Sequence, residues 1–288
     1  MRKSVSVAVA AVLGVVLLGV AACGGDDDGG EPAAVAIESA PTGDGQFELT
    51  VPQSVEAGLV RLDFQNGTEE DAEAQLLRLD EGHTVDEALE AIASEDGRIP
   101  DWLHAEGGVG MTKPGASGSV ELVLEEGTYH VIDTGEPEGD DVQSHAESGG
   151  TAMLEVSGGD DDAELPEVDA SIEMADFDFV VDGFEAGTNR FLLRNTGEEL
   201  HHTLVVPIKG DAAFEAVKAY MTSEEGDNGP PPVDFEKLQG TTVLDAGREQ
   251  IDELELVAGR YALVCFLTNR AGGPPHAALG MVSELTIE

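Results

Sequence analysis

The sequence is poor in cysteine and in basic residues. Its two cysteines, Cys23 and Cys265, are too few for a small fold held together by disulfides. Only 14 Lys and Arg residues stand against 59 Asp and Glu residues, which gives a formal net charge of −45. Such a chain has no basic patch to neutralise phosphates, so we expect no nucleic-acid partner and no electrostatic binding to an anionic membrane surface. Apolar residues, at 41%, suffice for ordinary cores, and the length predicts roughly two domains.

The N-terminus has the pattern of an export signal. Arg2 and Lys3 precede an uncharged stretch over residues 4–22. This stretch runs into the sequence Val-Ala-Ala-Cys-Gly, which resembles the lipobox of bacterial lipoproteins. The resemblance implies a signal peptide over residues 1–22, a lipid on Cys23, and an extracytoplasmic protein anchored to the cell membrane. An uncleaved membrane helix is the alternative, because the uncharged stretch could just span a bilayer.

Two acidic, glycine-rich segments divide the rest of the chain. Residues 23–33 are predicted to be a flexible tether, and residues 158–167 a linker between two domains. The domains, residues 34–157 and 168–288, share one pattern at a nearly constant spacing. The matching segments are Glu56-Ala57-Gly58 to Asn66 with Glu185-Ala186-Gly187 to Asn195, Gly127-Thr128-Tyr129 with Gly259-Arg260-Tyr261, and Leu154-Glu155-Val156 with Leu285-Thr286-Ile287. A period this long indicates a duplicated domain.

Short apolar stretches predict an all-β fold. Phe47 and Leu49 alternate with polar residues, which is typical of a strand with one buried face. The run from Tyr261 to Phe266 is continuously apolar and predicts a strand buried on both faces. Residues 84–94 and 211–221 instead have helical periodicity. We therefore expect two tandem antiparallel β-sandwiches, each with a short helical insertion.

The second domain combines a thiol, imidazoles and a thioether. Cys265 is followed by His276 and Met281, and two more histidines, His201 and His202, lie upstream after an Asn-containing turn. This order resembles the cupredoxins, the blue-copper domains, which take one ligand from an upstream His and the others from a Cys, a His and a Met around the last loop. The resemblance implies the cupredoxin-like fold and one copper ion in a type 1 site.

The ligands implied by this resemblance are His201, Cys265, His276 and Met281. Neighbouring strand residues face opposite ways, so only one of the adjacent histidines can point at the site. His201 is expected from its distance to the Asn turn, and His202 is the alternative. Two imidazoles and a thiolate, with a distant thioether, suit copper in both oxidation states.

The stretch between Cys265 and His276 departs from the small cupredoxins, in which it is shorter. Longer stretches occur in the copper nitrite reductase branch of the family. Gly272-Gly273-Pro274-Pro275 can turn the chain sharply, and Gly280 allows the backbone to approach the site. The competing interpretation is that Cys265 is a small core residue, His276 an ordinary loop residue and Met281 part of the core.

The first domain serves as an internal comparison. The repeat places Ala72, Asp133, His145 and Gly150 at the positions of the four ligands. Three ligands are therefore missing, and we expect a copper-free sandwich in which His145 is a solvated loop residue.

These residues predict a membrane-tethered copper protein that transfers single electrons. We expect an exposed His276 edge to exchange the electrons and the acidic surface to favour a basic redox protein as partner. We expect no enzyme: no histidine flanks Cys265, and seven histidines are too few at suitable spacing for a trinuclear copper cluster. The alternatives are a copper carrier or sequestration protein, and a metal-free surface lipoprotein that acts in protein interaction.

Overall fold

The structure is a computed structural model that describes residues 32–94, 97–135, 137, 143–159, 163–223 and 229–288. The predicted signal peptide and Cys23 lie outside these residues. Residues 32–288 form one compact unit. Among the described residues, no helix has both the length and the apolar character needed to cross a membrane.

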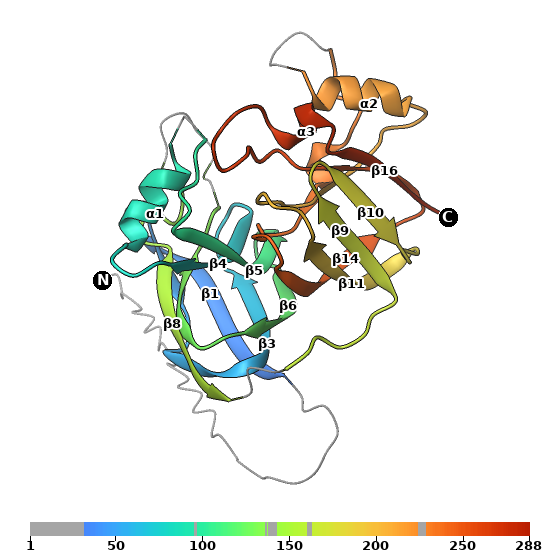
Figure 1. The fold of residues 1–288 in the computed structure, drawn as a ribbon. Helices are drawn as coiled ribbons and strands as arrows, with labels where there is room; N and C mark the ends of the chain where they lie inside the picture. The colour runs from blue at the N-terminus through green and yellow to red at the C-terminus, as the bar shows by residue number, and fades with distance from the viewer. Residues whose placement is uncertain (1–31, 95–96, 136, 138–142, 160–162, 224–228) are drawn as a thin grey trace, which may run out of the picture. The chain divides into compact units, whose positions relative to one another are not determined.

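The first half of this unit is a β-sandwich with four strands in each layer (Figure 1). One layer contains β2 (Gln46–Thr50), β1 (Ala33–Gly43), β3 (Ser54–Asn66) and β6 (Ser117–Leu124), in that order. The other contains β8 (Thr151–Gly159), β7 (Gly127–Ile132), β4 (Ala72–Leu79) and β5 (Leu103–Thr112). Alternate side chains such as Leu62, Phe64 and Leu122 are completely buried between the layers, as the period-two pattern predicts.

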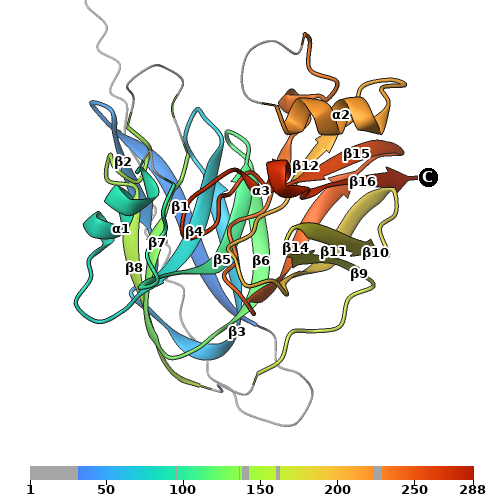
Figure 2. The same ribbon diagram turned by 45° about the horizontal axis from the view of Figure 1, so that its top comes forward.

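The second half repeats this strand order (Figure 2). One layer contains β10 (Asp178–Asp182), β9 (Ala170–Ala175), β11 (Gly187–Asn195) and β14 (Glu249–Leu256). The other contains β13 (Gln239–Gly240), β12 (Leu204–Pro207), β15 (Gly259–Val264) and β16 (Val282–Ile287). The all-β prediction with two tandem sandwiches is therefore confirmed.

Strand pairing differs from the antiparallel expectation in three places. Most pairs are antiparallel, but β1 pairs with β3, β3 with β8 and β9 with β11 in parallel. For β1 with β3 and β9 with β11 the reason is topological: a hairpin joins the first strand of each sandwich to the second, and the third strand then runs in the same direction as the first. The last strand of the first sandwich also extends to Gly159, into the predicted linker, and β1 begins at Ala33, in the predicted tether.

Both predicted helices are present, as α1 (Val85–Ile92) and α2 (Phe214–Met221). Helix α2 explains the continuously apolar run of β15. Ala262 and Val264 pack against Val217 of α2, whereas Tyr261 and Leu263 face the core between the layers. The short helices η1 (Phe235–Lys237) and α3 (His276–Leu279) have no counterpart in the sequence expectations.

Candidate metal centre

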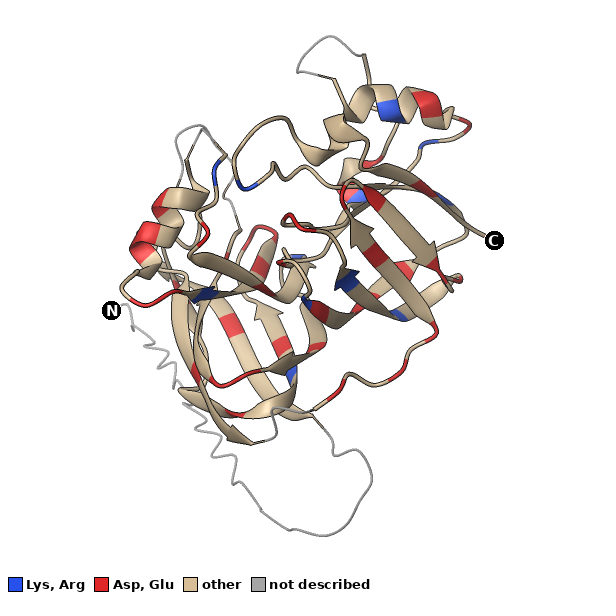
Figure 3. Ribbon diagram, in the orientation of Figure 1, with Lys and Arg blue, Asp and Glu red and all other residues tan. Residues whose placement is uncertain are grey.

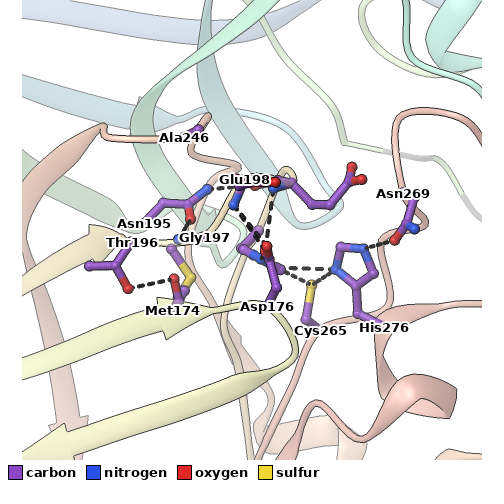
Figure 4. Close-up of polar contacts among 12 residues, drawn as sticks. Met174, Asp176, Asn195, Thr196, Gly197, Glu198, Ala246, Cys265, Asn269 and His276 are labelled. Carbon is purple, nitrogen blue, oxygen red and sulfur yellow. Dashed lines mark hydrogen bonds and ion pairs between the residues drawn. The ribbon is translucent and has the colours of Figure 1, made fainter.

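Three predicted ligands converge at one end of the second sandwich. Cys265 follows the last residue of β15, His276 is the first residue of α3, and the backbone of His201 pairs with Leu244. The Cys265 Sγ lies 3.5 Å from Nδ1 of His276 and 3.9 Å from Nδ1 of His201, and the two Nδ1 atoms are 3.1 Å apart. All three side chains have 0% exposed surface. A thiol and two imidazoles thus share one small, water-excluded space. Figure 4 shows the Cys265 thiol beside the His276 imidazole, with Asn269 on the other side of that ring.

The outer nitrogen of each imidazole is held by an oxygen acceptor. His201 Nε2 is 2.9 Å from Asp176 Oδ1, and His276 Nε2 is 3.1 Å from Asn269 Oδ1. Because a carboxylate and an amide oxygen only accept, both Nε2 atoms carry the proton and both Nδ1 atoms present a lone pair. Two lone pairs and one sulfur therefore face each other, an arrangement that fits a soft or borderline cation.

The electrostatics of the site keep it uncharged when it holds no metal. Burial, with a smaller contribution from His201, lowers the pKa of His276 to about 4. Burial also lowers the pKa of His201, although the hydrogen bond to Asp176 acts in the opposite direction. Burial raises the pKa of the Cys265 thiol to about 11. At neutral pH the site therefore holds two neutral imidazoles and a thiol, and binding a metal as thiolate releases a proton.

His202 and Met281 occupy different positions relative to this cluster. The His202 Nε2 accepts a hydrogen bond of 3.2 Å from the backbone N–H of Phe266, so this ring is engaged away from the three-residue cluster. Met281 has no exposed surface and belongs to the same core cluster as Cys265. Its backbone N–H donates to the His276 carbonyl and its carbonyl accepts from Cys265, which fixes Met281 next to both residues.

Local sequence explains how the loop returns His276 to Cys265. Gly272 and Gly273 have φ values of 81° and 125°, a region that favours glycine, so the chain can reverse before the two prolines. The His276 N–H then donates to the Leu267 carbonyl, and the Ala277 N–H donates to the Cys265 carbonyl. The predicted turn over Gly272–Pro275 thus has the expected role.

One expectation about the site is wrong. His276 has no exposed edge: its side chain is completely buried, and Asn269 covers the Nε2 atom. Asn269 itself belongs to the long stretch from Cys265 to His276, so this stretch covers the site.

Sequence reasoning missed Asp176 and Asn269. Asp176 accepts hydrogen bonds from the backbone N–H groups of Glu198 and Glu199 as well as from His201. Burial alone would raise the pKa of Asp176, but these hydrogen bonds outweigh it, and the pKa is lowered. Among 59 acidic residues, one aspartate at the end of a strand gives no signal of its own.

The equivalent place in the first sandwich contains a hydrogen-bonded pair. Asp133 Oδ2 lies 2.9 Å from Nδ1 of His145, and the Ser39 hydroxyl donates to the same oxygen. All three side chains are completely buried, so the expectation that His145 is solvated is wrong: the aspartate at the position of Cys265 pairs with it inside the fold. The backbone follows the second sandwich, since the Gly150 N–H donates to the His145 carbonyl as Met281 does to His276.

Glu73, beside this pair, is expected to make stability depend on pH. Burial raises the pKa of Glu73 to about 7, with smaller contributions from Asp133 and Asp71. A carboxyl group that keeps its proton longer in the folded state loses stability as pH rises from its ordinary value through 7. Glu73→Gln should therefore gain on the order of 2 kcal/mol over the wild type at pH 8 and much less at pH 5, measured by urea unfolding. An equal effect at both pH values would contradict this assignment.

Comparisons with known proteins give the following similarities. No family model and no curated protein matches the chain. Among solved structures, auracyanin B matches with 27% identity over 44% of this chain and 91% of its own, with a TM-score of 0.30. Auracyanin from the photosynthetic bacterium Roseiflexus castenholzii matches with 16% identity over 43% and 98%, with a TM-score of 0.29. A copper-containing nitrite reductase from Thermus scotoductus SA-01 matches with 12% identity over 88% and 61%, with a TM-score of 0.23.

Proposed function

We propose that the chain binds one copper ion through His201, Cys265 and His276 and transfers single electrons, with Met281 as weak axial ligand. The observation that supports this most strongly is the pair of inward-facing Nδ1 lone pairs beside a buried thiol. Copper would supply a one-electron couple stabilised by sulfur when reduced and by imidazole when oxidised. In this proposal, lipid on Cys23 anchors the protein to the cell membrane, on the side away from the cytoplasm. The shared strand order of the two sandwiches supports their origin as a repeat.

Burial of the cluster favours electron transfer over metal delivery. An electron can tunnel through a few bonds and contacts of a protein, whereas a carrier must bring its metal into contact with ligands of the recipient. Here all three donor side chains have 0% exposed surface, and the Nε2 atoms of the two imidazoles are held by Asp176 and Asn269. Ligands held in place also move little when the copper ion is oxidised or reduced, which keeps the reorganisation energy of electron transfer low. The carrier and the metal-free interaction protein remain the competing functions.

We propose no catalytic activity. Among the described residues, His201, Cys265 and His276 are the only group of at least three His, Cys, Asp or Glu side chains whose ligand atoms converge. The neighbours of Cys265 in sequence are Val264 and Phe266, so no histidine adjacent to Cys265 in sequence could connect the thiol to a second metal.

The surface near the site supports a protein partner. Phe266 and Leu279, which follow Cys265 and His276 in sequence, are 37% and 43% exposed. Acidic residues occur throughout both sandwiches, with few basic residues between them (Figure 3). A basic redox protein would be attracted by this charge and would reach the metal over a short apolar contact, and its association should weaken as salt is added.

Voltammetry of the copper-loaded full chain tests this function. We expect a reversible one-electron couple, and we expect Asp176→Asn to raise its potential. The amide still accepts from His201 but no longer places a negative charge near the metal, where it favours the oxidised ion. A shift of some tens of millivolts is expected, because tenfold in relative affinity corresponds to about 59 mV. A lower potential in the variant would contradict the role of Asp176, and a chain without a reversible couple would contradict electron transfer.

A further inference from the structure

The stretch between Cys265 and His276 is held against the first sandwich by hydrogen bonds. Arg270 lies in this stretch, and its side chain is 17% exposed. Its guanidinium donates to the carbonyl oxygens of Pro100 and Leu103, at 3.0 and 3.1 Å, and forms an ion pair with Asp245. Its backbone carbonyl accepts from Ile99. Three bonds thus join one residue of the metal loop to residues 99–103 of the first sandwich.

Neighbouring residues add contacts to the same place. The Thr268 hydroxyl donates to the Gly97 carbonyl at 2.7 Å, and Leu267 packs against the apolar cluster that contains Leu77 and Leu103 of the first sandwich. Asn269, the residue that holds Nε2 of His276, lies between Thr268 and Arg270. The first sandwich therefore fixes both sides of the residue that orients this ligand.

The segment that supports His201 is held by the first sandwich too. The backbone of Leu244 pairs with His201 on one side and with Glu106 of β5 on the other. The Asp245 N–H donates to the Ala105 carbonyl, and the Asp245 side chain receives Arg270. Both imidazoles are thus positioned against β5 and the residues that precede it.

We propose that the first sandwich acts as a brace, which means that its contacts hold the segments carrying His201 and His276 in place. Arg270 is the positioning residue that holds the Cys265–His276 stretch closed over the thiol. The part of this inference that concerns copper rests on the proposed function. The part that concerns closure of the loop does not, because Arg270 contacts Pro100, Leu103 and Asp245 and none of the proposed copper ligands. The first sandwich, which has no copper ligands of its own, would then help to hold copper in the second sandwich by positioning its ligands.

The test measures how fast iodoacetamide alkylates Cys265 in the metal-free full chain. Peptide mass spectrometry follows the Cys265 peptide alone, so that alkylation of Cys23 does not contribute to the measured rate. Arg270→Ala should increase the rate at Cys265 at least about tenfold, because several hydrogen bonds to a charged group are lost. Arg270→Lys keeps the charge without the forked geometry and should restore part of the protection. Arg190→Ala is the matched control, since Arg190 also pairs across the two sandwiches, with Glu121 at 2.9 Å, away from the loop.

The urea dependence of the rate separates opening of the loop from unfolding of the chain. In Arg270→Ala we expect a rate that changes little with urea below the unfolding transition, as local opening does. Two results would contradict the proposed role of the first sandwich. One is an alkylation rate in Arg270→Ala equal to that of the wild type, and the other is an increase that follows global unfolding and is also seen in Arg190→Ala.

A second experiment uses the copper-loaded protein. Arg270→Ala should lose Cu(I) to bathocuproine disulfonate about tenfold faster than the wild type, and an unchanged rate would contradict an effect of the brace on copper. If the wild type binds no copper, the proposed function is wrong, while the alkylation rates still show whether Arg270 holds the loop closed over Cys265.

Discussion

Cys265→Ser is expected to abolish the intense visible absorption of the copper-loaded protein. That absorption requires a thiolate bound to Cu(II), and Cys265 supplies the sulfur of the three-residue cluster. The affinity for Cu(I) should fall by more than the roughly 10–100-fold that follows loss of an outer hydrogen-bond partner, because a soft ligand itself is lost. Absorption spectra and Cu(I) competition measure the two effects.

The metal-free form of the same variant provides the control. A serine hydroxyl fits the space of the thiol and can donate to Nδ1 of His201 or His276, as the thiol does. The unfolding midpoint without copper should therefore stay close to that of the wild type. A variant that folds normally and keeps the absorption would show that the sulfur is not a ligand.

Asn195→Ala is expected to lower both stability and copper affinity. The Asn195 amide donates to the carbonyl oxygens of Glu199 and Leu244, at 2.8 and 2.9 Å, and accepts from the Gly197 N–H. These bonds fix the turn before His201 and the segment paired with it. Buried carbonyl groups left without donors should cost about 3 kcal/mol in urea unfolding.

The first sandwich offers a matched variant for this change. The Asn66 amide donates to the carbonyl oxygens of Glu70 and Thr112, at 2.8 and 2.7 Å, in the equivalent turn. Asn66→Ala should cost a similar free energy of unfolding and should leave the copper spectrum unchanged. If both variants weakened copper equally at temperatures where they remain folded, the effect would be one of general stability, and the specific role of Asn195 would be refuted.

Patterns of single residues predicted the elements of the fold and the cluster at its end. The alternation around Phe47 and the apolar run from Tyr261 follow directly from which faces of β2 and β15 are buried. The cluster of His201, Cys265 and His276 could be predicted because their order along the chain is distinctive. His202 lies at the same turn, and only the three-dimensional structure shows its ring hydrogen-bonded to Phe266 instead.

Other features depend on contacts between distant segments and could not be read from local sequence. Asp176 follows the last residue of β9 and reaches His201 across 25 residues of sequence, and its residue type is common in this chain. The burial of His276 results from the path of the long stretch before it. The same holds for His145, whose partner Asp133 stands where the second sandwich has a cysteine.

Titration of the full-length Cys23→Ser chain with Cu(II), followed by visible absorption and electron paramagnetic resonance, tests the central claim most directly. We expect an intense thiolate-to-copper band that saturates at one copper per chain, with the small hyperfine splitting of a type 1 site. Variants at Asp133 and His145 should give the same spectrum, since the first sandwich has no converging set of ligands among its described residues. A chain without this band, or one that takes up two copper ions in equivalent sites, would contradict the assignment.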